Sequence, residues 1–260
     1  MMISKTHEKY KEIKSLLKGS KEKYITATDD LQVLEIALKL KLEIMVLLYS
    51  KEMIFKDETK KLLDDLIASA SESYEISESA FKGLETKENH AGIVAKIKMK
   101  EYSLDDFKNM DFILVLDRLE IPGNVGTILR TLDSINCDGV ILVDSVTKIN
   151  NPKITSSSRG CNLIIPNIEL TYEEAQKFLL DNNYDIYLGE PKLGLNYQEY
   201  KYNTKTAIVV GNERFGINEN WYDNPNKKVF IPMEGSQNSL NVSVAASIIA
   251  YEVYMKKHSK

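Results

Sequence analysis

Residues 112–257 alternate short apolar runs with helix-like segments, and this alternation limits the fold more than any other feature of the chain. Continuous apolar runs such as FILVLDRL (112–119) are typical of strands that are buried on both faces of a parallel sheet. Further strands are expected at YDIYLG and at 139–144, 162–166, 206–211 and 228–233. Helices are expected at NVGTILRTLDSI, TYEEAQKFLLDNN and LNVSVAASIIAYEVYMKK. The alternation predicts an α/β fold with a mainly parallel sheet, covered by helices on both faces.

The first hundred residues carry a second, smaller series of α/β patterns. Strand-like runs IMVLLYS, SYEI and AGIVAKIK lie among helical patterns at 3–18, LQVLEIALKL, FKDETKKLLDDLIA and SESAFKGLE. The polar stretch KMKEYSLDDFKNMD then separates the two series. We therefore expect a domain at residues 1–100, a linker at 101–110 and a second domain at 111–260.

Composition places the chain among intracellular globular proteins. It has 260 residues, of which 43% are hydrophobic and 28% charged, enough to bury a substantial core. The N-terminus lacks the pattern of a signal peptide, and the longest apolar run, IMVLLY, is too short to span a bilayer. Cys137 and Cys161 are too few for a disulfide framework, so we expect reduced thiols and a cytoplasmic location without membrane association.

Charge and histidine usage exclude several kinds of site. The net charge of −4 argues against nucleic-acid binding by the whole surface, so any RNA contacts should be local patches. The three histidines, His7, His90 and His258, are scattered, which disfavours a metal site or a histidine relay. Neither a Walker loop nor a GxGxxG stretch follows any expected strand.

Polar residues and glycines gather where three strands of the second series are expected to end. The three stretches are LDRLEIPGNVGTILRT, IVVGNERFGI and IPMEGSQNSLNVSVAA. In open α/β sheets, ligands bind at loops beyond the carboxyl ends of strands, and all three stretches lie there. Each polar residue taken alone also has an ordinary explanation as a helix cap, a turn residue or a surface group. The residues in question are Asn124, Arg130, Glu213, Ser239 and Asn241.

In combination, the three stretches resemble the sequence motifs of the SpoU/TrmH family of SPOUT RNA 2′-O-ribose methyltransferases. The family pattern is Asn-x-Gly-x-x-x-Arg, then Gly-Asn-Glu-x-x-Gly, then Ile-Pro-Met-x-Gly-x-x-x-Ser-Leu-Asn-Val-Ser-x-Ala. This chain has NVGTILR, GNERFG and IPMEGSQNSLNVSVA in that order. The first hundred residues resemble the family's small substrate-binding domain, which tends to close with His-Gln-Gly-Ile-Val-Ala. Here the string is HAGIVA at 90–95, and Ala91 departs from the pattern.

The resemblance implies a fold, an activity and a cofactor. The fold is a C-terminal trefoil-knotted parallel-sheet (SPOUT) domain, preceded by a smaller N-terminal α/β/α ribosomal-protein-like domain that binds the RNA substrate. The activity is methyl transfer from S-adenosyl-L-methionine to a ribose 2′-hydroxyl of RNA, without a metal. By motif position, the main chain of Gly211, Ile231 and Leu240 holds the cofactor. The implied catalytic residues are Arg130, Asn124, Glu213, Ser239 and Asn241.

Arg130 takes the activating role by family precedent. A ribose hydroxyl is a weak nucleophile, so its attack requires removal of the proton or stabilisation of the forming alkoxide. Arginine side chains stay protonated in proteins, which makes a literal base a poor description. We therefore favour a cation that stabilises developing negative charge, while phosphate assists in removing the proton.

Two further features concern partners. Lys153 and Arg159, in the stretch NNPKITSSSRGCNLIIP, are either phosphate contacts or members of a mobile polar loop. Small residues at Ser243, Ala245, Ala246 and Ser247 allow close helix packing, and family precedent there implies a homodimer.

Three functions remain open from the sequence. Ribosomal RNA is the leading substrate, because a separate substrate domain is more usual in members that act on it. A tRNA 2′-O-methyltransferase of the same family is the first alternative, and a methylase at an antibiotic site of the ribosome is a narrower variant. A non-catalytic RNA-binding or ribosome-assembly factor is the alternative from another class.

Overall fold

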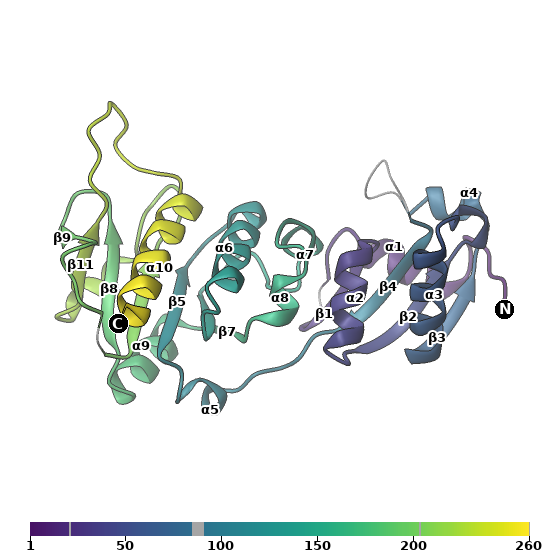
Figure 1. Cartoon of the computed structure of the whole chain (residues 1–260), viewed down its shortest axis with the longest axis horizontal. Helices are drawn as coiled ribbons and strands as arrows, with labels where there is room; N and C mark the ends of the chain where they lie inside the picture. Colours follow the sequence, from purple (N-terminus) through teal and green to yellow (C-terminus); the bar gives the residue numbers. More distant parts are fainter. Residues whose placement is uncertain (21, 85–90, 203, 260) are drawn as a thin grey trace. The chain divides into compact units, whose positions relative to one another are not determined.

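The computed structural model describes residues 1–20, 22–84, 91–202 and 204–259, and it divides into two compact units. Unit 1 contains Met1–Glu101 and Asn150–Ile164, and unit 2 contains Tyr102–Ile149 and Ile165–Lys260. Figure 1 shows their helices and strands. The assignment of 1–100, 101–110 and 111–260 to a substrate domain, a linker and a catalytic domain stays a prediction. His90, the first residue of the HAGIVA string, lies outside the described residues.

Unit 1 is built around a four-stranded sheet in the order β1-β4-β2-β3. Strand β4 runs antiparallel to β1 and β2, whereas β3 runs parallel to β2. Four α-helices and a short 3₁₀ helix precede or connect these strands along the described sequence. The bounds of the elements are β1 Ile25–Thr28, β2 Glu43–Tyr49, β3 Ala70–Glu75, β4 Ile93–Lys98, α1 Glu8–Leu16, α2 Leu31–Lys39, η1 Lys51–Met53, α3 Asp57–Ser69 and α4 Glu78–Lys82. Strand β1 was not expected from the sequence.

The central strand β2 supplies apolar side chains to two cores, because successive side chains of a strand point to opposite faces. Leu47 belongs to a cluster with Leu34 of α2 and Leu66 of α3. Its neighbour Leu48 belongs to a second cluster with Ile13 of α1 and, among others, residues of α4. The sheet of unit 1 is therefore covered by helices on both faces.

Residues 150–164 form two short helices that pack within unit 1, α7 Pro152–Ser157 and α8 Cys161–Ile164. The predicted strand at 162–166 is therefore wrong, and the strand lies just beyond it at β7, Asn167–Leu170. A short apolar run such as NLII fits a buried helix as well as a strand, so periodicity could not separate the two. Asn150 joins the segment to β1, since its Nδ2 donates to the carbonyl oxygen of Ile25 at 2.9 Å.

Unit 2 contains a seven-stranded sheet in the order β7-β6-β5-β10-β8-β11-β9. Every pair of neighbouring strands is parallel, as the apolar runs predicted. The bounds of its elements are α5 Leu104–Phe107, β5 Phe112–Asp117, α6 Pro122–Ser134, β6 Gly139–Val143, α9 Tyr172–Asp181, β8 Asp185–Glu190, β9 Leu195–Asn196, β10 Thr206–Val210, η2 Glu219–Asp223, β11 Lys227–Phe230 and α10 Val242–His258.

Both faces of this sheet are covered. Ile113 and Val115 of β5 cluster with Phe178 and Leu179 of α9. Leu114, between them in the strand, is also fully buried and faces the other way. On the opposite side α10 packs against α6 and β10. The expected α/β fold with a parallel sheet is confirmed.

Helix α6 begins three residues earlier than expected from the sequence, in which Asn124 is the natural N-cap of NVGTILRTLDSI. Its N-cap is Ile121, and Pro122 occupies the first helical position, where the fixed φ of proline and its missing N–H are well tolerated. Asn124, expected as the cap, therefore lies inside the first turn. Its side-chain amide is free to bond with other loops rather than with its own helix.

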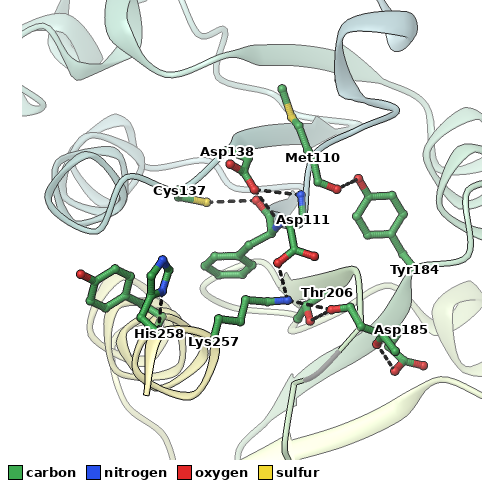
Figure 2. A network of polar contacts seen from close by, with 12 residues as sticks. Met110, Asp111, Cys137, Asp138, Tyr184, Asp185, Thr206, Lys257 and His258 are labelled. Atoms are coloured by element: carbon green, nitrogen blue, oxygen red, sulfur yellow. Dashed lines mark hydrogen bonds and ion pairs between the residues drawn. The ribbon is translucent and has the colours of Figure 1, made fainter. Parts of the chain in front are cut away.

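A polar network, the strand-start network, connects the amino-terminal ends of β5, β6, β8 and β10 (Figure 2). Asp138 Oδ2 accepts the backbone N–H groups of Asp111 and Phe112, both at 2.8 Å. The Tyr184 hydroxyl donates to the Met110 carbonyl oxygen at 2.6 Å. Lys257, near the end of α10, donates to Asp111 Oδ2 at 2.7 Å and so joins the last helix to the start of β5.

Cys137 and Cys161 are buried, and neither forms a disulfide. Burial raises the pKa of the Cys137 thiol to about 12, which keeps it protonated at neutral pH. Among the described residues, the helices are all too short or too polar to cross a membrane.

Candidate functional site

The three polar stretches follow β5, β10 and β11, so they meet at the carboxyl edge of one parallel sheet. Strands β5 and β10 are direct neighbours, which brings the loop that leads into α6 beside the loop 211–216. Residues 231–241 connect β11 to α10, and α10 packs against α6 (Figure 1). The sheet topology thus gathers segments from positions 117, 211 and 241 of the chain.

The loop 211–216 is a tight turn held by Asn212. The backbone N–H of Asn212 donates to the carbonyl oxygen of Gly216 at 3.0 Å, and the N–H of Gly216 donates to the carbonyl oxygen of Asn212 at 2.9 Å. Gly216 has φ +70, a conformation that glycine adopts without strain. At Gly211, a Cβ atom would lie 2.3 Å from the carbonyl carbon of Gly216, so the close approach of the two backbones requires glycine.

The side chain of Asn212 connects this turn to the end of β5. Its Nδ2 donates to the carbonyl oxygen of Arg118 at 2.8 Å, while its Oδ1 accepts the N–H of Arg214 at 2.9 Å. Asn212 is buried, which fits a residue whose hydrogen-bonding groups are used internally. Asn212 was not among the residues predicted for the site, although it stands between Gly211 and Glu213 in GNERFG.

Glu213, Asn124 and Asn241 form one hydrogen-bonded chain across the three loops. Glu213 Oε1 accepts the Nδ2 of Asn124 at 2.9 Å and the backbone N–H of Ile121 at 3.2 Å. Asn124 Oδ1 in turn accepts the Nδ2 of Asn241 at 3.3 Å. The carboxylate of Glu213 therefore satisfies donors at the start of α6 and fixes the direction of the Asn124 amide.

Asn241 has a second function as the cap of α10. Its Oδ1 accepts the N–H of Ser243 at 2.9 Å and the Ser243 hydroxyl at 2.6 Å. An asparagine cap satisfies a free N–H of the first helical turn. The Asn241 side chain therefore both caps α10 and bonds to Asn124 in the candidate site.

Arg130 and Ser239 do not join this chain. Arg130 lies six residues after Asn124 in α6, is exposed, and makes no hydrogen bond or ion pair within the described part of the chain. Ser239 is also exposed and has no hydrogen-bond partner in residues 1–20, 22–84, 91–202 and 204–259. The structure therefore brings three of the five predicted catalytic side chains into contact and leaves two open to solvent.

A cavity of about 600 Å³ lies beside these loops. Gly211, Ile231 and Leu240 all line it, so the three residues predicted to hold a cofactor share one hollow. Glu213, Ser239 and Asn241 also contribute to its wall. The volume falls within the range of about 300–1,000 Å³ that small-molecule sites occupy, and apolar side chains alternate there with peptide groups.

Among the other residues that line the cavity are Glu190 and Tyr222, which were not predicted from the sequence. Glu190 ends β8, and the Tyr222 hydroxyl on η2 donates a hydrogen bond to its Oε1. Partial burial raises the pKa of the Glu190 carboxyl, and the charge of Lys228 acts in the opposite direction. The position of Glu190 at the carboxyl end of a strand was the available signal.

Asp117 closes the carboxyl end of β5 beneath the site. It is fully buried, and its Oδ2 accepts the N–H of Asn218 at 2.7 Å. Burial raises the pKa of the Asp117 carboxyl, while the N–H of Asn218 and the nearby Arg118 act in the opposite direction. The neighbouring Arg118 Nε lies 3.6 Å from the same oxygen.

No group of three histidine, cysteine, aspartate or glutamate side chains within the described ranges is placed to hold a metal ion. The polar groups of the site are instead amides, carboxylates, hydroxyls and an arginine. This set suits the orientation of an organic substrate by hydrogen bonds and charge.

Similar proteins and structures agree with this arrangement. The chain is 30% identical to the 23S rRNA (guanosine(2553)-2′-O)-methyltransferase RlmP of Bacillus subtilis over 203 residues, which cover 78% of this chain and 80% of the relative. An RNA 2′-O ribose methyltransferase superposes with a TM-score of 0.80 and 26% identity, over 98% of both chains. An AdoMet-bound rRNA methyltransferase from Sinorhizobium meliloti shares the fold, with a TM-score of 0.86, 22% identity and coverage of 97% and 96%.

The sequence profile described as the SpoU rRNA Methylase family matches residues 111–251. The matched range includes the β5–α6 loop, the turn 211–216 and the cap of α10, that is, every residue of the hydrogen-bonded chain described above. The chain therefore belongs to the SpoU rRNA methylase family.

Proposed function

We infer that the protein is an S-adenosyl-L-methionine-dependent RNA 2′-O-ribose methyltransferase that acts on ribosomal RNA. The observation that carries the inference is the hydrogen-bonded chain of Glu213, Asn124 and Asn241 beside a cavity lined by Gly211 and Leu240. It places polar side chains and a cofactor-sized hollow at the same edge of the sheet. Membership in the family supports the reaction class.

The cavity fits the proposed cofactor. Ile231, Leu240 and Ile249 offer apolar surface for an adenine ring, and the peptide groups around Gly211 can bond to its edge. The backbone contact that requires glycine at position 211 also brings these peptide groups close to the hollow. When bound, the cofactor supplies an electrophilic methyl group on a sulfonium.

The residues of the chain supply orientation and charge. Asn124 is held by Glu213 and Asn241, so its amide keeps one direction without any ligand. Such preorganised dipoles stabilise developing charge without rearranging during the reaction. The exposed guanidinium of Arg130 has no internal partner in the described residues, which leaves it available to an RNA phosphate or to the reacting 2′-oxygen.

Ribosomal RNA is proposed as the substrate because the relative RlmP acts on 23S rRNA and is similar over most of both chains. Unit 1 is proposed to be the RNA-binding, ribosomal-protein-like domain, and its four-stranded sheet with helices on both faces supports this assignment. The exposed Lys153 and Arg159 of residues 150–164 are candidate phosphate contacts. A cytoplasmic location follows from the proposed substrate.

The trefoil knot belongs to the same proposal. Its support is the return of the chain from β11, near one edge of the sheet, to α10 beside α6 and β10. The likeness of fold to solved family members over nearly the whole chain adds further support.

We also propose a homodimer formed through α10. Val244, Tyr251 and Met255 are 47%, 45% and 55% exposed, and their spacing of seven and four residues places them on one stripe of the helix. Large apolar side chains that share a stripe on a surface helix are candidates for an interface. Equilibrium sedimentation tests this part, and a stable monomer at working concentration would contradict it.

The function is tested by methylation mapping. Total RNA from cells with and without the gene is compared for 2′-O-methyl marks, with rRNA and tRNA read separately. We expect one rRNA ribose to lose its mark, and the position equivalent to that named for RlmP is the first to examine. Loss of a tRNA mark alone would move the substrate to tRNA. Unchanged RNA together with no calorimetric binding of S-adenosyl-L-methionine would favour a non-catalytic RNA-binding factor.

A further inference from the structure

Glu190 is a carboxylate in the wall of the cavity with no part in the chain of Glu213, Asn124 and Asn241. It is the last residue of β8, and its register partner on β11 is Phe230. Ile231, which follows Phe230 directly, lines the same cavity. The pairing of the two strands therefore places the Glu190 side chain next to a residue of the proposed cofactor site.

Tyr222 holds this carboxylate in place. Its hydroxyl donates to Glu190 Oε1, and Tyr222 lies on η2, a short helix that is anchored in the core by the fully buried Trp221. The Tyr172 hydroxyl also donates to the carbonyl oxygen of Asn220 at 2.6 Å. Glu190 Oε1 thus has a fixed donor, while no bond of the described residues uses Oε2.

The electrostatic surroundings favour neutral hydrogen-bond donors as the partner of Glu190. Lys228 Nζ lies 5.1 Å from the centre of the Tyr222 ring, on the strand next to β8. Partial burial raises the pKa of the Glu190 carboxyl, and the charge of Lys228 acts in the opposite direction without cancelling this effect. With one cation already nearby, the free oxygen needs a donor more than it needs a second positive charge.

Glu190 also lies on the side of the cavity away from the reacting groups. In the sheet, β10 separates β8 from β5, so the ends of β8 and β5 are about 10 Å apart at roughly 4.8 Å per strand. Asn124 belongs to the loop after β5 and Glu213 to the loop after β10. A cofactor bound with its methyl group on the Glu213 side of the cavity would have room for its adenosine on the β8 side.

We propose that Glu190 binds the 2′,3′-diol of the cofactor's ribose, with Tyr222 orienting the carboxylate. A carboxylate can accept hydroxyl donors from both positions of a diol, and such charge-assisted hydrogen bonds are stronger than neutral ones. This inference rests on the proposed function, since it assigns a residue to the cofactor of that reaction.

Calorimetric titration of the full chain with S-adenosylhomocysteine and with its 3′-deoxy analogue tests the assignment without any turnover. For Glu190→Ala we expect the affinity for S-adenosylhomocysteine to fall about tenfold or more, since hydrogen bonds to a charged group are lost. For the 3′-deoxy analogue, the affinities of the wild-type protein and Glu190→Ala should differ much less than they do for S-adenosylhomocysteine. S-adenosyl-L-methionine should lose as much affinity as S-adenosylhomocysteine, because both carry the diol.

Three variants sharpen the result. Glu190→Gln keeps one acceptor oxygen and should give an intermediate loss. Tyr222→Phe removes only the orienting hydroxyl. It should therefore weaken the binding of S-adenosylhomocysteine and S-adenosyl-L-methionine less than Glu190→Ala does. Glu219→Ala removes an exposed carboxylate on η2 that does not line the cavity, and it should bind like the wild type.

Each contrary result has a distinct meaning. Unchanged affinity of Glu190→Ala for S-adenosylhomocysteine overturns the proposal, and so does an equal loss for the 3′-deoxy analogue. A loss confined to S-adenosyl-L-methionine also overturns it, since Glu190 would then pair with the sulfonium charge. Failure of the wild-type protein to bind either ligand would instead contradict the proposed function.

Discussion

The two edges of the parallel sheet in unit 2 use similar polar residues in different ways. At the amino-terminal edge, the strand-start network pairs its groups with one another, as with Lys257 and Asp111 at 2.7 Å (Figure 2). At the carboxyl edge, Glu213, Asn124 and Asn241 bond to each other, but Arg130 and Ser239 have no partner among the described residues. The polar groups of the strand-start network are thus paired within the protein, whereas two of the polar side chains at the carboxyl edge are not.

The difference separates groups that hold the fold from groups that are available to a ligand. A polar group with its partners inside the protein contributes to stability, and its removal leaves an unsatisfied donor or acceptor. A charged side chain that is exposed and unpaired contributes little to stability, so its removal changes mainly what the protein binds or catalyses. Substitutions at the two edges should therefore affect different measurements.

Arg130→Ala should have the largest effect on activity. We expect kcat for RNA methylation to fall about 100-fold or more, because a cation that stabilises developing charge would be lost. The melting temperature and the affinity for S-adenosyl-L-methionine should stay unchanged, since Arg130 has no internal bond in the described structure and does not line the cavity. Steady-state methylation kinetics, thermal unfolding and calorimetry give the three values.

Arg130→Lys serves as the matched variant. Lysine keeps the charge but lacks the planar fork of donors, so partial activity would indicate that charge dominates. Turnover by Arg130→Ala at the wild-type rate would remove Arg130 from the site. A lowered melting temperature of Arg130→Ala would instead show that Arg130 stabilises the fold, as the paired groups of the strand-start network do.

Asp138→Ala should give the largest loss of stability among the polar groups of the strand-start network. Its Oδ2 accepts two N–H groups at the start of β5, and both would lose their partner. We expect the free energy of unfolding in urea to fall by about 2 kcal/mol. Asp133→Ala, an exposed position of α6, is the control and should unfold like the wild type. An unchanged unfolding free energy for Asp138→Ala would contradict the contrast between the edges.

The parallel sheet and the position of the three polar stretches at its carboxyl edge followed from the sequence because both depend on local patterns. FILVLD reads as a buried strand without knowledge of its neighbours, and NVGTILR, GNERFG and IPMEGSQNSLNVSVA each follow a strand. The packing of residues 150–164 within unit 1 did not follow, because it depends on contacts with β1 and α2, far away in sequence. The start of α6 was misplaced because proline at the first helical position outweighed asparagine as a cap.

Within the candidate site, the sequence indicated which polar residues follow the strands but not how they are connected. The bonds between Glu213, Asn124 and Asn241 join positions 89 and 117 residues apart, and only the order of the strands brings them together. Glu190 was missed because a single polar residue after a strand has no distinguishing pattern. Asn212 is a fixed position of the GNERFG motif, but the motif does not reveal that its side chain bonds to the end of β5. Their functions become visible only through the carbonyl, hydroxyl and cavity that they contact.

Asp117 provides a test in which pH is the variable. Burial raises the pKa of its carboxyl in the folded state above the value in the unfolded chain. Between these two values the folded state binds more protons, so this contribution to stability grows as pH falls and is complete below the unfolded pKa. It is lost as pH rises through the folded pKa.

Urea unfolding of wild type and Asp117→Asn between neutral pH and about pH 4 measures this contribution. Asparagine does not titrate, so the unfolding free energy of the wild type should rise relative to that of the variant as the pH falls. The bond from the Asn218 N–H can be kept by the amide oxygen of the variant. A difference between the two proteins that stays constant with pH would show that the Asp117 carboxyl does not titrate differently in the folded and unfolded states.

Lys257→Met should give the smallest effect and the most direct contrast with Arg130→Ala. Lys257 donates to Asp111 and to the carbonyl oxygen of Thr204 at 2.8 Å, but the Asp111 side chain is 61% exposed, so solvent weakens the pair. We expect unfolding in urea to become easier by at most about 1 kcal/mol, with kcat and cofactor affinity unchanged. Both substitutions remove one positive charge from unit 2. If Lys257→Met also lost methylation, the effect of Arg130→Ala would be due to overall charge. It would then not depend on the exposed, unpaired position of Arg130 at the carboxyl edge.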